Sequence, residues 1–416
     1  MPISNLKNLN FRLYEAGCLF LLCAFLLAAC SNEIPEKRII ERSGRTVLAY
    51  LVANNASGDL GAYLKENVED MYEALASSKD SCTLLVYYRP AVSDRMVANP
   101  LLLEFLCDGE GRINGQAALL GREADFEHIL EQAHCIKEYR ESAHSAVKPQ
   151  TMKTIFKDMQ DAAPSDSYGL ILGSHASGWL PGTPVEPRAF GDDAGYNIDI
   201  PQLADVLGSA FPKKLDFILF DACMMGTAEV CYELKDMTRY CVASVMETPA
   251  YGFPYDDILL ELYKPQVDFR IVCSKFISFN EAEKAWGTCA AFDCSQIEEL
   301  ALAVRSELEQ NATSWEDFNY TSVQQYGLGS TYNYFSFDVA DFFRVLHGGE
   351  DSPLIDAALQ KVVIAKDCIP DGYYPVDETR FCGIGMYYPK LEKSWNPYYK
   401  ASISWYQAVG WEQVIN

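Results

Sequence analysis

The chain has 416 residues, of which 34 are Lys or Arg and 58 are Asp or Glu, giving a formal net charge of −24. Hydrophobic residues make up 49% and charged residues 22% of the sequence, which excludes a disordered chain. Binding to nucleic acid or to anionic lipid depends on clustered Lys and Arg, so this acidic chain is expected to do neither.

The first 29 residues have the pattern of an export signal. Lys7 and Arg12 give a positively charged start, and the apolar run CLFLLCAFLLAA follows at 18–29. A helix of twelve residues is too short to cross about 30 Å of hydrocarbon, but this length suits the hydrophobic part of a secretory signal. Residues 1–29 are therefore predicted to be a signal peptide outside the fold.

The end of this segment, Leu-Ala-Ala-Cys, resembles a bacterial lipobox, in which the cysteine is lipidated and becomes the new N-terminus. We therefore expect a lipid anchor on Cys30, with a plain signal peptide cut near Ala29 as the alternative. Ser31 at the next position is typical of sorting to the outer membrane, although the sequence does not distinguish its two sides. Residues 30–45 then comprise the lipidated cysteine and a polar tether.

Beyond the tether, apolar strands alternate with helices that have regular apolar spacing. The sequence predicts strands at 46–53, 82–89, 101–107, 168–174, 216–222 and 240–245, and helices at 60–77, 123–143, 150–162 and 225–235. Further on, it predicts helices near 256–263, 265–283 and 295–310, and strands near 288–292 and 381–388. This order indicates an α/β fold with a mostly parallel sheet and helices on both faces.

Eleven cysteines remain after Cys30, an odd number, so at least one thiol stays free or pairs between molecules. None of them forms a C-x-x-C pair, and the five histidines do not lie at zinc-ligand spacing from them. We therefore expect no metal site and interpret most of these cysteines as small buried apolar residues.

Two segments carry the residue types of a nucleophilic site. Residues 174–179 (SHASGW) and 221–226 (DACMMG) each directly follow an apolar strand. Open α/β sheets place their functional sites at the carboxyl ends of such strands. His175 is the only histidine at a strand end followed by a Gly/Ser turn, and Cys223 is the only cysteine at a predicted strand-to-helix junction.

A thiolate–imidazole pair in this arrangement can attack a carbonyl group. The start of a helix and a nearby imidazole lower the pKa of a thiol, and backbone N–H groups can hold the oxyanion that forms. The expected donors are the N–H groups of Cys223 and of Ala176, in the turn after His175. Either residue alone is more often structural, but their joint placement favours catalysis.

The motifs H-x-x-G-W (His175–Trp179) and D-A-C-x-M-G (Asp221–Gly226), whose His and Cys are 48 residues apart, resemble the clostripain family of cysteine peptidases. That family is related in fold to caspases, gingipains and legumains. The resemblance covers residues 46–416 and includes the segments 244–249, 252–255, 288–293, 337–342 and 383–389. It implies a caspase-like α/β/α sandwich, with a peptidase core at 46–300 and a smaller α+β extension at 301–416.

By position, the resemblance makes Cys223 the nucleophile and His175 the base. Family members mostly cleave after Arg or Lys and have an acidic residue in the specificity pocket, which Asp221 matches. Residues two apart on a strand point the same way, so Asp221 shares a face with Cys223, and its carboxylate can hold a guanidinium. The alternative is that Asp221 only orients the turn. Glu247 and Thr248 are further candidates for the pocket wall.

The sequence departs from the family at Ala176 and Ser177, where glycines are common. The methyl group of Ala176 narrows the turn, which affects the geometry of the oxyanion hole or the range of substrates. This departure is the only sequence support for an alternative, a catalytically degenerate relative that keeps the caspase-like fold as a surface binding lipoprotein. The presence of Cys223, His175 and Asp221 favours the enzyme.

Family members are often made as proenzymes and cut between the two catalytic residues. Residues 180–195 are rich in Pro and Gly and contain one basic residue, Arg188, after which we expect self-cleavage. Some members depend on calcium, but the acidic residues Asp192, Asp193 and Asp199 show no EF-hand pattern. We interpret them as a solvated loop, so calcium stays an option from the resemblance and no other cofactor is expected.

The sequence thus predicts a monomeric cysteine endopeptidase of the cell envelope. Its expected partners are peptides or proteins with Arg or Lys at the cleavage site. Its lipid is expected to be its only contact with the membrane. The residue after the lipidated cysteine indicates that this is the outer membrane.

Overall fold

The computed structural model describes residues 44–55, 60–140, 145–181, 189–311, 318–326, 335–391 and 393–414. The chain divides into two compact units, Met1–Ile40 and Glu41–Asn416, and all of the described residues belong to the second. The predicted signal, Cys30 and Arg188 therefore lie outside the described residues. The boundary expected at residue 300 stays a prediction.

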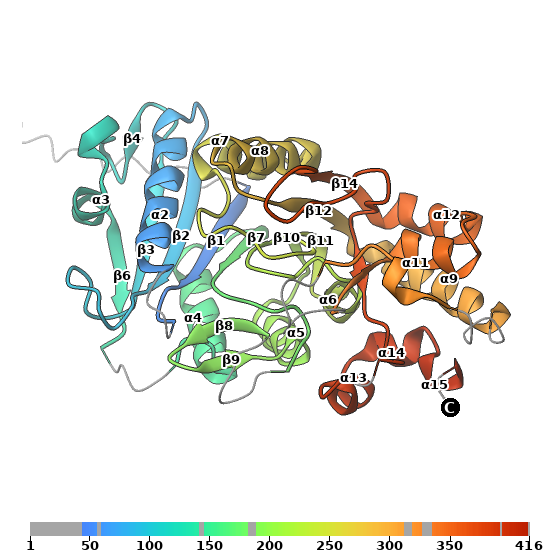
Figure 1. The fold of residues 1–416 in the computed structure, drawn as a ribbon. Coiled ribbons are helices and arrows are strands. Elements are labelled where there is room, and N and C mark those ends of the chain that lie inside the picture. The colour runs from blue at the N-terminus through green and yellow to red at the C-terminus, as the bar shows by residue number, and fades with distance from the viewer. Residues whose placement is uncertain are drawn as a thin grey trace, which may run out of the picture. The chain divides into compact units, whose positions relative to one another are not determined.

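One large mixed sheet organises the described part of the chain (Figure 1). Its path runs β14-β12-β11-β10-β7-β1-β2-β3-β4-β5, and β6 also pairs with β3. The middle strands are parallel, whereas β12 and β14 at one end and β3 to β6 at the other are antiparallel. The bounds are β1 (Arg45–Val52), β2 (Cys82–Arg89), β3 (Leu101–Cys107), β4 (Arg112–Ile113), β5 (Gln116–Ala117), β6 (His134–Glu138), β7 (Ser167–Gly173), β10 (Leu215–Asp221), β11 (Thr238–Ala243), β12 (Thr288–Asp293) and β14 (Val363–Cys368).

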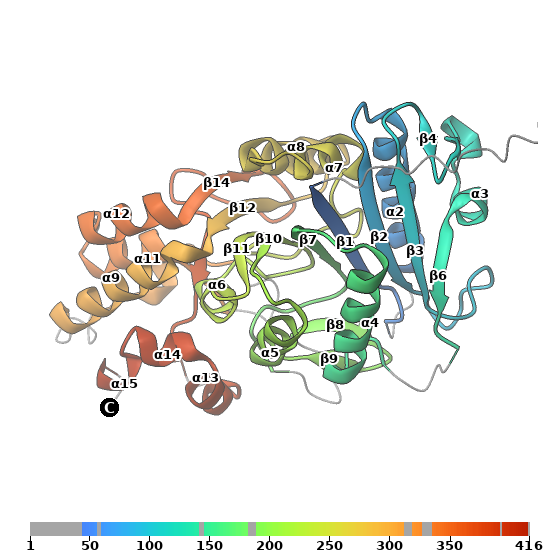
Figure 2. The same ribbon diagram turned by 180° about the vertical axis from the view of Figure 1, so that it is seen from behind.

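Helices cover both faces of this sheet, as the two views in Figures 1 and 2 show. One face packs against α2 (Leu60–Ser77), α3 (Phe126–Gln132), α7 (Tyr255–Leu262) and α8 (Phe269–Ala282). The other face packs against α4 (Pro149–Ala162), α5 (Ile200–Ala210), α6 (Ala228–Leu234), α9 (Ile297–Gln310), α11 (Val339–Leu346) and α12 (Pro353–Val362). The predicted α/β class with helices on both faces is confirmed.

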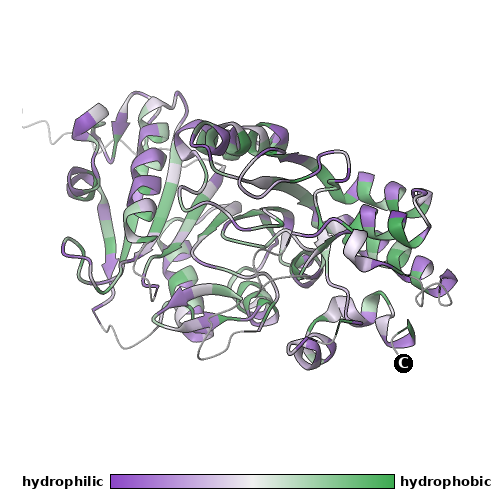
Figure 3. Cartoon of the chain, viewed as in Figure 1, coloured by the Kyte–Doolittle hydropathy of each residue, from purple (hydrophilic) through white to green (hydrophobic). Residues whose placement is uncertain are grey.

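The central strands are buried because their side chains are apolar on both faces. In β1, residues Val47, Ala49 and Leu51 enter one core, whereas Leu48 and Tyr50 enter the other. Alternate side chains of a strand point to opposite faces, so a continuous apolar run fills both cores. Figure 3 shows the same pattern as hydrophobic central strands and helices striped between hydrophobic and hydrophilic.

Smaller elements complete the core on the face of the sheet that carries α4, α5 and α6. Two short pairs lie outside the main sheet, β8 (Phe190–Asp193) with β9 (Tyr196–Ile198) and β13 (Phe337–Asp338) with β15 (Gly385–Met386). The C-terminal end forms α13 (Asn396–Ser402), α14 (Ser404–Ala408) and α15 (Trp411–Val414). Trp405 and Trp411 are fully buried, as expected of aromatic residues that pack rather than bind a ligand. No helix among the described residues has both the length and the apolar character needed to span a bilayer.

Two predicted elements differ from the structure. The helix expected at 123–143 is replaced by α3 and the edge strand β6, because Asp125 caps the start of α3 and residues 134–138 pair with β3 instead. The strand expected at 381–388 contracts to the two residues of β15, which pair only with the equally short β13.

Candidate active site

The two predicted catalytic residues follow neighbouring parallel strands. His175 comes two residues after β7, and Cys223 comes two residues after β10. Gly173 and Asp221 are opposite each other in the β7–β10 ladder, and the N–H of Ser174 donates to the carbonyl of Asp221 over 3.3 Å. The ladder therefore brings His175 and Cys223 to the same edge of the sheet.

A cavity of about 380 Å³ opens at this edge. The six candidate site residues that lie in the described part of the chain all line it: His175, Ala176, Asp221, Cys223, Glu247 and Thr248. None of the described residues that line the cavity is Lys or Arg. The described part of the cavity wall thus combines a thiol, an imidazole and carboxyl groups. It contains no Lys or Arg side chain that would supply a positive charge.

The Cys223 thiol is half-buried and is held by the backbone of Thr248. Its Sγ accepts a hydrogen bond from the Thr248 N–H (3.4 Å) and donates one to the Thr248 carbonyl (3.8 Å). Burial raises the pKa of Cys223 to about 12; the charges of Glu247 and Asp221 act in the same direction, against the N–H groups of Thr248 and Ala176. The thiol is therefore neutral at physiological pH in the free protein and needs a base to ionise.

Asn55, which lies between the strand predicted at 46–53 and the helix predicted at 60–77, also belongs to the site. Its side-chain Nδ2 lies 2.9 Å from Nε2 of His175, and Asn55 is 6% exposed. Asn55 follows β1, which pairs with β7 in parallel, so the third strand end in a row also contributes a polar side chain. That placement directly after an apolar strand was the available signal.

The turns after His175 and Cys223 fit closely together. Gly178 has φ +63°, and a Cβ there would lie 2.7 Å from the carbonyl oxygen of Met224. Met224 itself has φ 60°, an uncommon conformation for a residue other than Gly, directly after Cys223. A tight turn at each strand end therefore sets the distance between the segments that carry His175 and Cys223.

The segment at the start of β8 pairs with the turn after His175. The N–H of Ser177 donates to the carbonyl of Ala189 (3.0 Å), and the N–H of Gly191 donates to the carbonyl of His175 (2.8 Å). The Ser177 hydroxyl, one of the two departures from the family pattern, accepts a hydrogen bond from the Ala189 N–H over 3.0 Å. Ser177 is therefore used to hold Ala189 at the cavity wall.

Asp221 is buried at the cavity wall. Its Oδ2 accepts a hydrogen bond from the Tyr255 hydroxyl over 3.0 Å, and any Cβ at Gly252 would collide with its carboxylate. Burial raises the pKa of Asp221 to about 6, against hydrogen bonds from the Tyr255 hydroxyl and the Phe253 N–H. The carboxylate is thus charged at pH 7 and above, although it carries a cost of burial that a cationic ligand would offset.

The prediction that Asp192 and Asp193 lie in a solvated loop is wrong, because both residues are buried. The Asp193 carboxylate accepts hydrogen bonds from the Asn54 side chain, the Arg89 guanidinium and the Ala146 N–H. The β1 and β2 strand ends and the start of α4 surround it, and buried charges need such partners. Asp193 is therefore a structural anchor beside the site.

Comparisons with known proteins agree with this architecture. The model of the clostripain family matches residues 49–416. The fold is similar to that of a secreted C11 cysteine protease from Bacteroides thetaiotaomicron in complex with an irreversible peptide inhibitor, with 24% identity, a TM-score of 0.68, and coverage of 89% of this chain and 99% of that one. It is also similar to an inactive zymogen C11 protease from Parabacteroides distasonis, with 24% identity, a TM-score of 0.66, and coverage of 88% and 98% respectively.

No curated protein matches the sequence significantly. The match to the family model nevertheless spans nearly all of the described residues, including the ends of β7 and β10, which line the cavity. The chain belongs to the clostripain family and is a cysteine peptidase.

Proposed function

We propose that this chain is an endopeptidase of the cell envelope that cleaves after Arg or Lys, with Cys223 as nucleophile and His175 as base. The observation that carries the proposal is the single cavity whose wall contains His175, Cys223 and Asp221. A thiol, a base and a buried carboxylate in one cavity are the three parts that thiol-dependent cleavage beside a basic residue requires.

The proposed reaction has two stages. In the first, His175 takes the proton of the Cys223 thiol, the sulfur attacks the scissile carbonyl, and the N–H groups of Cys223 and Ala176 hold the oxyanion. The C–N bond then breaks as His175 returns the proton to the leaving amine. In the second stage, His175 takes a proton from water, which attacks the thioester and releases the new carboxyl terminus and the thiol.

Asn55 would set the tautomer of the base. An Asn side chain can present either its oxygen or its nitrogen to a neighbour, because a rotation of 180° exchanges them. With the Asn55 oxygen toward Nε2–H, the other ring nitrogen of His175 carries no proton and is the basic atom. The same oxygen then stabilises the imidazolium that forms when the thiol ionises.

Asp221 would bind the basic side chain of the substrate. A guanidinium or ammonium group of the substrate would form an ion pair with the Asp221 carboxylate in a buried pocket. The charge of Asp221 is one of the factors that raise the pKa of Cys223. Binding of a cation there would therefore favour the thiolate, so that recognition of the substrate promotes ionisation of the nucleophile.

The proposed self-cleavage after Arg188 is supported by the residue that follows it. Ala189 lines the catalytic cavity and has φ 91°, a strained conformation for a residue other than Gly. A cut after Arg188 would release this strain, because it removes the peptide bond that defines φ of Ala189. Mapping new N-termini in the purified protein and in Cys223→Ala tests this, and identical cuts in both would contradict self-processing.

The decisive test of the function is hydrolysis of fluorogenic peptides that end in Arg, Lys, Asp or Leu, with calcium and reductant present. We expect turnover of the Arg and Lys peptides only, and none by Cys223→Ala. Failure to turn over any peptide would favour the catalytically degenerate surface binding lipoprotein. Metabolic labelling with a fatty acid, compared between the wild type and Cys30→Ser, tests the proposed lipid anchor.

A further inference from the structure

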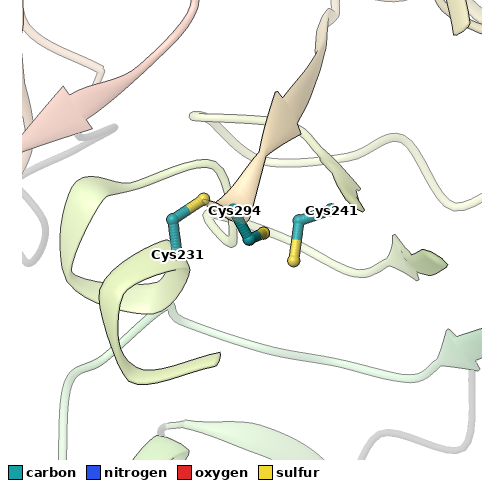
Figure 4. Close-up of side chains that lie close together, drawn as sticks. All are labelled: Cys231, Cys241 and Cys294. Carbon is teal, nitrogen blue, oxygen red and sulfur yellow. The ribbon is translucent and has the colours of Figure 1, made fainter. Parts of the chain in front are cut away.

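Three cysteine side chains converge in the core on the face of the sheet that carries α6. Cys231 lies in α6, Cys241 in β11, and Cys294 at the start of a 3₁₀ turn (η2, Cys294–Gln296) that directly follows β12. Figure 4 shows the three side chains close together, with Cys294 between Cys231 and Cys241. The sulfur atoms all lie within 4.8 Å of one another, and each residue is at most 1% exposed.

The spacing of these sulfur atoms suits a bound metal ion. A metal–thiolate bond is about 2.3 Å long, so three thiolates around one ion in a plane are separated by about 4 Å. The observed upper limit of 4.8 Å is close to this value. Within the part of the chain that the structure describes, no fourth His, Cys, Asp or Glu joins the group at this spacing.

We propose that Cys231, Cys241 and Cys294 form a three-coordinate thiolate site for a soft monovalent ion, Cu(I). Soft sulfur ligands select Cu(I), zinc or iron–sulfur clusters. A structural zinc site takes four protein ligands, and an iron–sulfur cluster is held by four, so a set of three favours Cu(I), which accepts trigonal coordination. These residues are 10 and 53 positions apart, so no short spacing motif reveals them.

Binding involves no change of oxidation state. Each thiol that becomes a ligand loses its proton to solvent, and one metal–sulfur bond replaces each S–H bond. The Lys214 ammonium acts electrostatically on Cys294. The same ammonium offsets part of the negative charge of the occupied site.

The position of the site gives the ion a structural consequence. The turn that holds Cys223 leads into α6, and β11 leads into the segment that contains Thr248. An ion bound to Cys231 and Cys241 would therefore connect the segments on both sides of the nucleophile. This predicts that the ion raises the thermal stability of the protein without entering the catalytic cavity.

The test uses the full chain in a background that removes the more accessible thiols and those of the N-terminal segment: Cys223→Ala, Cys135→Ser, and Ser in place of Cys18, Cys23 and Cys30. Cu(I) is titrated anaerobically against a chromogenic Cu(I) chelator. We expect one tightly bound Cu(I) per chain, sulfur-only coordination by X-ray absorption, and a rise in Tm of several degrees. No competition with the chelator, or binding of Zn(II) in preference to Cu(I), would overturn the proposal.

Matched variants separate the site from general thiol binding. Cys273 and Cys289 are also buried and lie next to each other, but they form a pair and not a group of three. Cys294→Ala is expected to weaken Cu(I) binding at least 100-fold, whereas Cys289→Ala leaves it unchanged. Circular dichroism checks that both variants are folded. Equal loss in the two variants, or retention in both, would contradict a site at Cys294.

Discussion

Asp221 is subject to two opposite requirements, because burial favours its neutral form whereas the proposed substrate needs its charge. Its pKa of about 6 lies about two units above the ordinary value, which corresponds to about 3 kcal/mol of folding free energy. Since the folded-state pKa is raised, the neutral form is stabilising below pH 4, and this stability is lost as the pH rises through 6. At pH 7 the fold therefore bears the full cost of the charge.

Replacement of Asp221 by Asn is expected to stabilise the protein and to disable it. At pH 7.5, Asp221→Asn should raise Tm by roughly 2–4 °C, because the amide keeps an acceptor for Tyr255 without a buried charge. It should lower kcat/KM for Arg peptides by about 100-fold or more, since the ion pair is lost. In the wild type, cleavage of Arg peptides should increase with pH through about 6.

The control is Glu247→Gln, at a carboxyl group that lines the same cavity but is less buried. It should change both quantities less than Asp221→Asn does. A loss of stability in Asp221→Asn, with cleavage of Arg peptides retained, would rule out this role for the carboxylate.

Asn55 should affect the rate of catalysis more than the binding of substrate. Asn55→Ala removes the group 2.9 Å from His175 Nε2, so kcat should fall by about 10- to 100-fold while KM changes little. Asn67→Ala is the control, since Asn67 lines the cavity but bonds to Tyr251. Equal effects of the two variants would count against a positioning role.

His175 and Cys223 could be selected from the sequence because each follows a long apolar strand. This pattern is local and is visible in a single sequence. Asn55 occupies the same kind of position but has no chemistry that singles it out until its contact with His175 is known. The burial of Asp193 was missed for a related reason. Its partners Arg89 and Ala146 are distant in sequence, so local polarity alone indicated a solvated loop.

At the scale of elements, the Met224 carbonyl limits the size of the side chain that the turn after β7 can carry at position 178. Gly178→Ala places a methyl group 2.7 Å from the Met224 carbonyl and also requires φ +63° of a residue with a Cβ. Such strain costs about 1–3 kcal/mol, so Tm should fall by several degrees, and kcat should fall as the two catalytic segments separate. Thermal denaturation and peptide hydrolysis measure the two effects.

Gly111→Ala is the matched control for Gly178→Ala. Gly111 has φ +79° but nothing within 4 Å of the position of a Cβ, so it reports the backbone cost alone. The difference between the two variants isolates the contact between the turns. Variants of equal stability and activity would show that the contact with Met224 does not set the geometry of the site.

The central strands were predictable because a strand that is buried on both faces has a continuous apolar run. This run can be recognised in the sequence of the strand alone, without knowledge of its neighbours. Edge strands were not, because they are half-exposed and depend on a neighbour. β6 is mostly exposed and was mistaken for helix, and β14 mixes buried with partly and fully exposed residues and was not predicted. For both, pairing with β3 or β12 decides the structure, and that information is not local.

At the scale of the whole molecule, Glu229 joins α6 to the C-terminal part of the chain. Its Oε1 accepts hydrogen bonds from the Tyr387 N–H (2.8 Å) and the Tyr399 hydroxyl (2.9 Å). Burial raises its pKa to about 7, against those hydrogen bonds. Stability contributed by its neutral form is therefore present below about pH 4.5 and is lost as the pH rises through 7.

Glu229→Gln should reduce the pH dependence of stability. In the wild type, the free energy of unfolding should fall between about pH 5 and 8, with a contribution from Glu229 of about 3 kcal/mol. The Gln variant cannot ionise, so its denaturation curves should vary less over that range. Glu233→Gln, on the same helix but partly exposed, is the control. Parallel pH profiles for the wild type and Glu229→Gln would refute this account.

The β7–β10 ladder has a consequence for a chain cut after Arg188. The fragment before the cut would contain β1, β2 and β7, whereas the fragment after it would contain β10, β11 and β12. The seam between the two fragments would run through the middle of one sheet, where adjacent parallel strands share backbone hydrogen bonds and two apolar cores. Processing would thus convert one chain into a non-covalent heterodimer whose halves copurify under native conditions and separate only in denaturant.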